Sequence, residues 1–347
     1  MTIANELGRG RFLSTIERSR NIYITTHINP DPDAIACAFG MQYLLKKALR
    51  RKSVIIQSGV IGRAENKALI SECGIKSVDA STVTVTSDDC LILLDAQHVN
   101  SNYPFRRSVR PEIVIDHHPL RAPTYTLPFY DIRPRYGATA EILVEYFKQF
   151  GIPFSRAVAT ALYYGIKTDT ANWSRSTGHD IAVCHSLAEH IDDKMLSRIE
   201  YPELPVDYYR QIHKGLTTAV RYGSIITVHL HALPSPDYAS LIADFFLRAE
   251  DVHWVFVTGR LADAVIFSLR CTRARENAGD VIKALVGKQG SGGGHSNSAA
   301  GKIPTAGLTE AELEKIEHEL VAKLLKRLHG RIIVGDLFID TASNRTV

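Results

Sequence analysis

The architecture of the first half of the chain is indicated by the segment Ile22-Tyr23-Ile24-Thr25-Thr26-His27-Ile28-Asn29-Pro30-Asp31-Pro32-Asp33. It begins with a short apolar run rich in β-branched residues, which is typical of a strand buried on both faces. Histidine and aspartate follow where this run ends, and an amphipathic helical pattern then extends from about Ile35 to Leu49. This order predicts an α/β unit with polar residues at the carboxyl end of its first strand.

The same order repeats through the first half of the chain. Short apolar runs lie at 54–56, 90–94 and 113–115, and helical patterns cover 138–150 and 156–165. Strands that alternate with helices predict a mainly parallel sheet with flanking helices.

A polar helical segment, broken by Pro202 and Pro205, precedes a second α/β pattern. In that second pattern we expect strands near 225–231, 254–258 and 264–270, helices near 238–248, 278–286 and 309–328, and a glycine turn at 290–294. The sequence therefore predicts a parallel-sheet domain over residues 1–185, a helical linker over 186–223 and a smaller α/β domain over 224–347.

The composition is that of an ordinary globular protein, with 45% hydrophobic and 22% charged residues and a net charge of +4 among 347 residues. So small a charge does not distinguish nucleic-acid binders from other proteins. The five cysteines are widely spaced and form no CxxC pair, which indicates neither a disulfide framework nor a zinc ribbon. With no 18-residue apolar run and no apolar leader, we expect a cytoplasmic protein without a membrane partner.

Acidic and histidine residues follow three of the predicted strands and one predicted helix. They are His27, Asp31 and Asp33 after the first strand, Asp95 after 90–94, Asp116, His117 and His118 after 113–115, and Asp169 after a helix. Open parallel sheets bind ligands at this edge. Taken alone, Asp33 could equally cap the following helix and a histidine pair could face solvent, but their joint occurrence favours a site. Carboxylates with imidazoles suit divalent ions such as Mn²⁺, and two ions about 3.5–4 Å apart can activate water against a phosphoryl group.

These segments resemble, in order and spacing, the four motifs of the DHH phosphoesterases. The resemblance implies that His27 and Asp31 bind one metal ion, that Asp33, His117 and Asp169 bind the other, and that Asp95 bridges the two. It also implies that Asp116 orients the neighbouring imidazole and that His118 faces the scissile phosphate as an electrostatic stabiliser or proton donor.

Two segments of the second half carry a further resemblance. A glycine run could be a flexible linker or a backbone nest for phosphate, and an arginine at a strand end could be solvated or grip a terminal phosphate. Ser268-Leu269-Arg270 and the glycine run before His295 resemble the signatures of DHHA1 domains, which implies that Arg270, Gly292, Gly293, Gly294 and His295 bind substrate. Residues 296–298 separate His295 from Ala299-Ala300-Gly301, one residue more than in many oligoribonuclease-type members, so the substrate stays open.

The preferred interpretation is a nanoRNase-like enzyme with two divalent metal ions, Mn²⁺ or Mg²⁺, that hydrolyses RNA of about two to five nucleotides or adenosine 3′,5′-bisphosphate. Linear dinucleotides are an alternative substrate. A RecJ-like exonuclease would need further nucleic-acid-binding modules, so no stable complex with long DNA is expected. Pyrophosphatases and exopolyphosphatases of the wider superfamily have a different second domain. A non-catalytic nucleotide-binding protein would be expected to have lost ligands, whereas all six positions are present. The resemblance is compatible with a homodimer.

Overall fold

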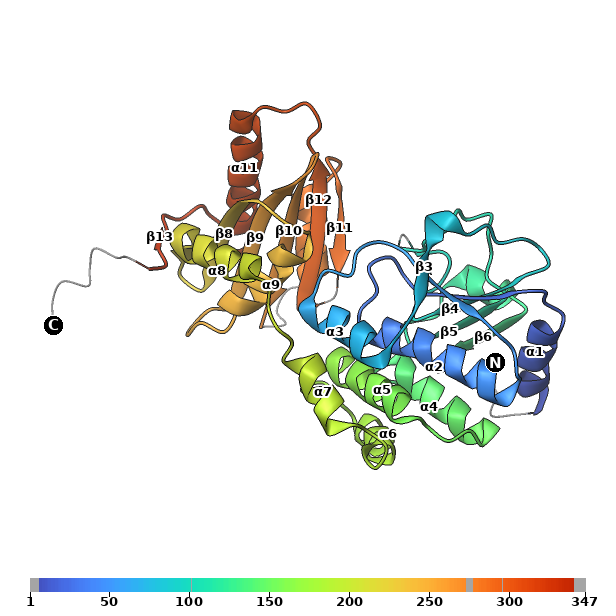
Figure 1. Cartoon of the computed structure of the whole chain (residues 1–347). Helices are drawn as coiled ribbons and strands as arrows, with labels where there is room; N and C mark the ends of the chain where they lie inside the picture. Colours follow the sequence, from blue (N-terminus) through green and yellow to red (C-terminus); the bar gives the residue numbers. More distant parts are fainter. Residues whose placement is uncertain (1–5, 101, 273–276, 295, 340–347) are drawn as a thin grey trace. The chain divides into compact units, whose positions relative to one another are not determined.

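A computed structural model of the protein describes residues 6–100, 102–272, 277–294 and 296–339 (Figure 1). The chain divides into two compact units, Met1–Glu203 and Leu204–Val347. Each unit has its own sheet and its own hydrophobic core. The predicted fold class, a parallel-sheet domain followed by a smaller α/β domain, is confirmed. Within the described ranges, no helix combines the length and apolar character that crossing a membrane would require.

The six strands of the first sheet all run parallel. Their order is β3 (Ser77–Asp79), β2 (Val54–Gln57), β1 (Ile22–Thr25), β4 (Cys90–Leu94), β5 (Ile113–Asp116) and β6 (Phe129–Ile132). The chain progresses in opposite directions from β1 and from β4, so the carboxyl ends of these two neighbours form the switch point at which such sheets bind ligands. The apolar pattern did not predict β3 or β6, because these short strands mix apolar and polar residues.

Both faces of this sheet are buried, which explains its unbroken apolar runs. One face packs against α2 (Pro32–Ala48), α4 (Thr139–Phe150) and α5 (Arg156–Asp169), which lie side by side (Figure 1). The other face lies under loop residues that include Tyr103 and Leu127. The remaining helices of the unit are α1 (Glu6–Glu17), α3 (Ala64–Cys73), α6 (Gly178–Ala188) and α7 (Asp193–Glu200), with short 3-10 turns at Ala80–Thr82 and Ala122–Thr126.

The first turn of α2 lies close to α5. Asp31 is the N-cap of α2, and its side chain accepts the Ala34 N–H at 3.0 Å. The alternative interpretation in which Asp33 caps this helix is therefore wrong, because Asp33 lies inside the first turn. Gly165 of α5 permits the close approach, since a Cβ there would lie 3.1 Å from Asp33 Cα. The end of α5, with Asp169, is thereby brought to the start of α2.

The second unit is built on a mixed sheet in which β8 and β9 are parallel and the other pairs are antiparallel. The strand order is β11 (Ser291–Gly294), β12 (Ser298–Pro304), β10 (Ala264–Cys271), β9 (Trp254–Leu261), β8 (Ile225–Ala232), β7 (Val220–Tyr222) and β13 (Asp336–Leu337). Helices α8 (Val206–Thr218) and α9 (Asp237–Phe246) cover one face, and α10 (Ala278–Val286) and α11 (Glu310–His329) cover the other.

The glycine turn predicted at 290–294 is wrong, because most of this segment forms the edge strand β11. The glycines are required by close packing rather than by a turn. A Cβ on Gly292 would lie 2.6 Å from Ile282 Cγ2 of α10, and a Cβ on Gly290 would lie 2.1 Å from the Lys302 carbonyl oxygen. Pairing with β12 is a tertiary contact, which the local glycine pattern does not reveal.

Candidate active site

Eight histidine and aspartate side chains meet at the carboxyl edge of the first sheet. Potential ligand atoms lie within 4.8 Å of one another in three groups, which are His27, Asp31 and Asp95; Asp33, His117 and Asp169; and Asp95, His117 and His118. The groups share Asp95 and His117, so they form one continuous site. The structure thus brings together all six residues expected to be metal ligands, and their role in binding metal stays a prediction.

Two histidines present the same ring nitrogen to the site. His27 Nδ1 lies 3.0 Å from the Ile28 carbonyl oxygen, and His117 Nδ1 lies 3.1 Å from the Tyr136 carbonyl oxygen. Because a carbonyl oxygen only accepts, each ring carries a proton on Nδ1. Both Nε2 atoms are therefore available to bind a cation, which is how metal-ligating histidines are commonly held.

The contacts of these Nε2 atoms fit a site for cations. His117 Nε2 is 3.1 Å from Asp169 Oδ2, and that oxygen is buried with no hydrogen-bond partner among the described residues. Two acceptor atoms at this separation repel each other unless a proton or a metal ion lies between them. His27 Nε2 lies 3.7 Å from Asp95 Oδ2 and 3.8 Å from Asp31 Oδ2. Imidazole nitrogens with several carboxylate oxygens form a donor set suited to Mn²⁺.

The carboxylates crowd one another. Burial, followed by the charges of Asp31 and Asp95, raises the pKa of Asp169 to about 7. Burial, again followed by the charge of Asp95, also raises the pKa of Asp33 well above its ordinary value. Excess negative charge at the edge of the sheet is what divalent cations would neutralise.

Asp95 is held by a residue that the sequence analysis did not select. Its backbone is left-handed, with φ 57°, a conformation that aspartate tolerates better than bulky residues. The buried carboxylate accepts the Thr139 hydroxyl at 2.8 Å, and that hydroxyl in turn accepts the His117 N–H at 3.2 Å. Thr139 therefore links two proposed ligands. One threonine at the start of a helix carries no signal in a single sequence.

Asp33 combines a capping contact with its place in the site. Its two oxygens accept the N–H groups of Thr139 at 2.7 Å and Ala140 at 2.9 Å, so it binds the N-terminus of α4 rather than capping α2. Each carboxylate oxygen has two lone pairs, so these bonds leave acceptor capacity for a cation held together with His117 and Asp169. Its contact with the N-terminus of α4 is therefore compatible with metal binding.

His118 is oriented through Asp116 and Gln97. Asp116 accepts both the His118 N–H at 3.1 Å and its Nδ1–H at 2.8 Å. Gln97 donates to Asp116 at 2.8 Å, while its own oxygen accepts Arg121 N–H at 2.7 Å and the Thr124 hydroxyl at 3.0 Å. Burial disfavours the charged His118 ring, but the hydrogen bond and charge of Asp116 raise its pKa to about 9. An imidazolium in this position can stabilise an anion or donate a proton. Gln97 was not predicted.

The backbone after Asp169 is strained. Ala171, Asn172 and Trp173 are consecutive left-handed residues, with φ of 52°, 51° and 71°. This conformation costs about 1–2 kcal/mol for each non-glycine residue. Arg175 donates to the Asp169 carbonyl oxygen at 2.8 Å across this turn. Such strain concentrates at functional sites, which agrees with the position of Asp169.

The residues expected to bind substrate in the second unit lie on neighbouring strands. Arg270 is mostly buried rather than solvated, and its Nε donates to Asp244 Oδ1 at 2.6 Å. In the sheet register Arg270 pairs with Ser298 of β12, next to the residue that pairs with Gly294. The structure thus places Arg270 and the glycines 292–294 on either side of β12. His295 lies outside the described residues.

The comparisons with known proteins agree with this architecture. Residues 21–166 match the DHH family, N-terminal domain, and residues 223–324 match the DHHA1 domain. The chain therefore belongs to the DHH family and carries a DHHA1 domain.

Two relatives are similar in sequence over different lengths. An uncharacterized protein of Methanocaldococcus jannaschii is 33% identical over 318 residues, which are 89% of this chain and 64% of that protein. A probable manganese-dependent inorganic pyrophosphatase of Streptococcus pyogenes is 27% identical over 171 residues, which are 48% of this chain and 55% of the relative. The chain thus spans less than two thirds of the length of either relative.

Two solved structures are similar in fold. An exopolyphosphatase-related protein from Bacteroides fragilis has a TM-score of 0.73 and 18% identity, covering 93% of this chain and 98% of that one. RecJ from Thermus thermophilus in complex with Mn²⁺ has a TM-score of 0.54 and 14% identity, covering 92% and 55%. At these identities the likeness concerns the fold alone.

Proposed function

We propose that the protein is a metal-dependent phosphoesterase that hydrolyses short RNA of about two to five nucleotides or adenosine 3′,5′-bisphosphate. The observation that carries the proposal is the set of three ligand groups linked through Asp95 and His117, one of which includes His118. Family membership supports metal-dependent hydrolysis. The manganese named for the Streptococcus relative and for the RecJ structure supports Mn²⁺, with Mg²⁺ as the alternative.

The proposed ligands divide between two ions. His27 and Asp31 would hold one, Asp33, His117 and Asp169 would hold the other, and Asp95 would bind both. Bound divalent ions lower the pKa of a water molecule and neutralise charge on a phosphoryl group.

The protein's own groups then have separate tasks. His118 stabilises the phosphoryl oxygens or donates a proton to the leaving oxygen, and Asp116 and Gln97 keep its ring in place. Thr139 fixes the Asp95 carboxylate through its hydroxyl. These contacts preorganise the site, which is the main protein contribution to reactions of this type.

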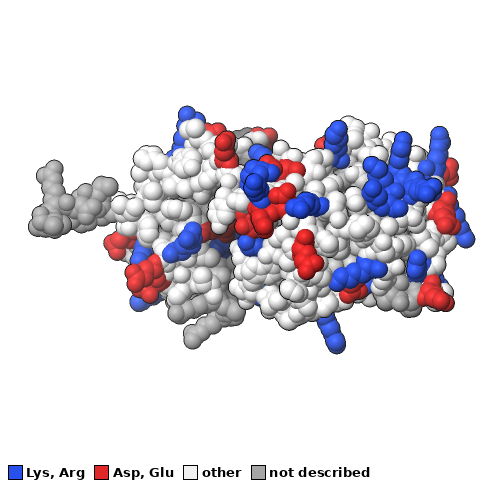
Figure 2. Space-filling model, turned by 60° about the horizontal axis from the view of Figure 1, so that its bottom comes forward, with Lys and Arg blue, Asp and Glu red and all other residues white. Residues whose placement is uncertain are grey.

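We further propose that Arg270 and the glycines 292–294 bind the other end of the substrate. Arginine binds phosphate through two parallel hydrogen bonds, and closely approaching backbone N–H groups can add to them. Binding of both ends of the substrate favours short substrates. On the face that Figure 2 shows, Lys and Arg side chains lie among acidic ones.

The test is hydrolysis by the Mn²⁺-loaded protein of a 5′-labelled RNA ladder from two to about twenty-four nucleotides. Adenosine 3′,5′-bisphosphate, a linear dinucleotide and inorganic pyrophosphate are assayed in parallel. Rates that fall steeply beyond about five nucleotides support the proposal, whereas equal rates on long strands assign an exonuclease. Hydrolysis of pyrophosphate alone would favour the activity named for the Streptococcus relative. Nucleotide binding without any hydrolysis would indicate a binding protein.

A further inference from the structure

A second group of histidines lies in the other unit, where β8 meets α11. His229 of β8 is half-buried, and its Nδ1 lies 2.7 Å from the Thr258 hydroxyl of β9. The Thr258 hydroxyl donates to Glu317 Oε1 of α11 at 3.1 Å, because a carboxylate only accepts. Its single proton is thus used, and the contact with His229 must be an Nδ1–H donating to the hydroxyl. The Nε2 atom of His229 therefore carries a lone pair.

The surroundings of His229 disfavour the charged form of its ring. Burial lowers its pKa, and the neighbouring His318 and His231 lower it further against the opposing charge of Glu317. The negative charge of Glu317 is balanced by Arg260, which donates to its Oε2 at 2.6 Å. The Nδ1–H of His229 is held by the Thr258 hydroxyl, which is in turn held by the Glu317 carboxylate. Histidines that bind metal ions through Nε2 are commonly held by hydrogen bonds of this kind.

Two more imidazoles lie beside this ring. The ring centroids of His229 and His318 are 5.9 Å apart. His231 follows on the same strand, and Leu230 between them is fully buried in the core on the α8 and α9 side. The strand changes direction at this point. It has a β-bulge between His229 and Ala232, and the backbone of His231 is left-handed, with φ 54°.

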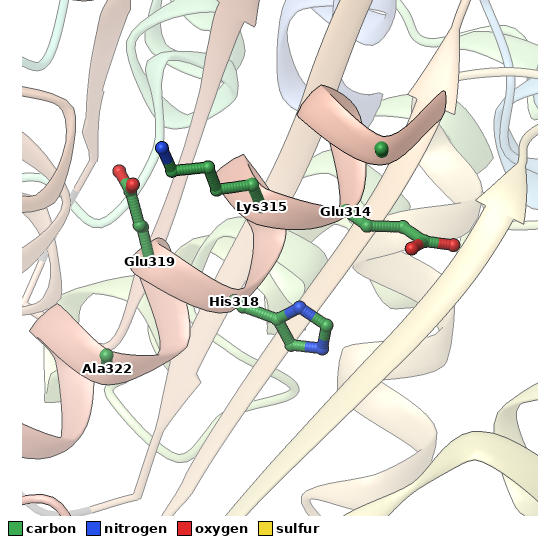
Figure 3. A pocket seen from close by; sticks show the side chains of 6 residues that line it. Glu314, Lys315, His318, Glu319 and Ala322 are labelled. Atoms are coloured by element: carbon green, nitrogen blue, oxygen red, sulfur yellow. The ribbon is translucent and has the colours of Figure 1, made fainter. Parts of the chain in front are cut away.

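The helix contributes a carboxylate at suitable spacing. Glu314 precedes His318 by four residues, so both lie on one face of α11. Figure 3 shows Glu314 and His318 directed to one side of the helix, with Lys315 and Glu319 directed to the other. A surface hollow of about 490 Å³ is lined by these four side chains of α11 together with Ala311 and Ala322.

We propose that His229, His231, His318 and Glu314 form a binding site for one Zn²⁺ ion. A helix that supplies two ligands at i and i+4 can direct both at one metal ion, and the His229 ring lies beside that of His318. Three imidazole nitrogens and one carboxylate oxygen are a zinc donor set, richer in nitrogen than the site in the first unit. His231, His318 and Glu314 are exposed, and their side chains would have to rotate toward the half-buried His229 to bind the same ion. The bound ion would link α11 to β8.

The test measures the zinc content of the full-length, Mn²⁺-loaded protein after equilibrium dialysis against buffered Zn²⁺. Wild type is expected to bind one more zinc ion per chain than His318→Ala, in which an exposed side chain is replaced. The double variant His229→Ala/His318→Ala is expected to bind as few zinc ions as His318→Ala. Thr258→Val removes only the support of His229 and is expected to weaken zinc binding about 10- to 100-fold. His329→Ala, which removes an exposed histidine at the end of the same helix, is the control and keeps the ion.

Zinc is also expected to raise the melting temperature of wild type more than that of His318→Ala. Equal zinc content in wild type, His318→Ala and the double variant would overturn the proposal. The Asp95→Ala variant separates this site from the first one, because it is expected to retain the zinc that His318→Ala loses. Loss of that zinc in Asp95→Ala would assign the ion to the first unit and would also overturn the proposal.

Discussion

Thr139→Val tests the network that holds the proposed bridging carboxylate. The substitution keeps the shape of the side chain but removes the hydroxyl that donates to Asp95 at 2.8 Å and accepts the His117 N–H at 3.2 Å. A hydrogen bond to a charged group contributes about 1.5–3 kcal/mol. If this contribution is lost in the transition state, kcat falls about 10- to 100-fold, because each 1.36 kcal/mol corresponds to a factor of ten.

The assay is hydrolysis of a short labelled RNA at saturating Mn²⁺, together with direct titration of Mn²⁺ affinity. Thr139→Ser is the matched control, since it retains the hydroxyl and is expected to stay near wild type in both measurements. Wild-type turnover and Mn²⁺ affinity in Thr139→Val would show that the hydroxyl does not hold the Asp95 carboxylate in place. An equal loss in Thr139→Ser would show that packing of the methyl group, rather than the hydroxyl, causes the effect.

Three further predictions concern other groups. Asp95→Ala is expected to abolish turnover by removing the shared ligand, and near-normal turnover would exclude the two-metal mechanism. Arg270→Ala is expected to raise KM for terminally phosphorylated substrates about tenfold or more with little change in kcat, and an unchanged KM would remove the anchor assignment. Burial and the charge of Asp180 raise the pKa of Glu141 to about 8. The neutral form of Glu141 therefore contributes its full share of the unfolding free energy below the ordinary pKa near 4.5, and this contribution is lost as pH rises to 8. Glu141→Gln is therefore expected to reduce the decline in unfolding free energy over this range, by up to about 1.4 kcal/mol per pH unit, and an unchanged pH profile in chemical denaturation would contradict this.

The sequence indicated the position of the candidate site wherever a candidate residue directly follows a buried strand. The runs that became β1, β4 and β5 are apolar throughout, and each is followed by an acid or a histidine, so the edge of the sheet could be located without coordinates. The same approach missed Thr139 and Gln97, because each is a common polar residue whose partners are distant in the chain. It also predicted a turn for the glycines that form β11, since strand pairing with β12 depends on the tertiary fold.

The start of α4 explains how so many acids can be buried around one edge of a sheet. Four consecutive N–H groups point at carboxyl groups: Gly137 donates to Asp180, Ala138 to Glu141, and Thr139 and Ala140 to Asp33. Free N–H groups at a helix N-terminus carry partial positive charge, so they offset negative charge without any cation. Asp33 is therefore fixed by the fold itself, whereas Asp169 Oδ2 has no such donor among the described residues. The carboxylates of Asp33 and Asp95 are thus held in place by protein hydrogen bonds, so a metal ion would not be needed to position them. A bound ion would instead provide a partner for Asp169 Oδ2.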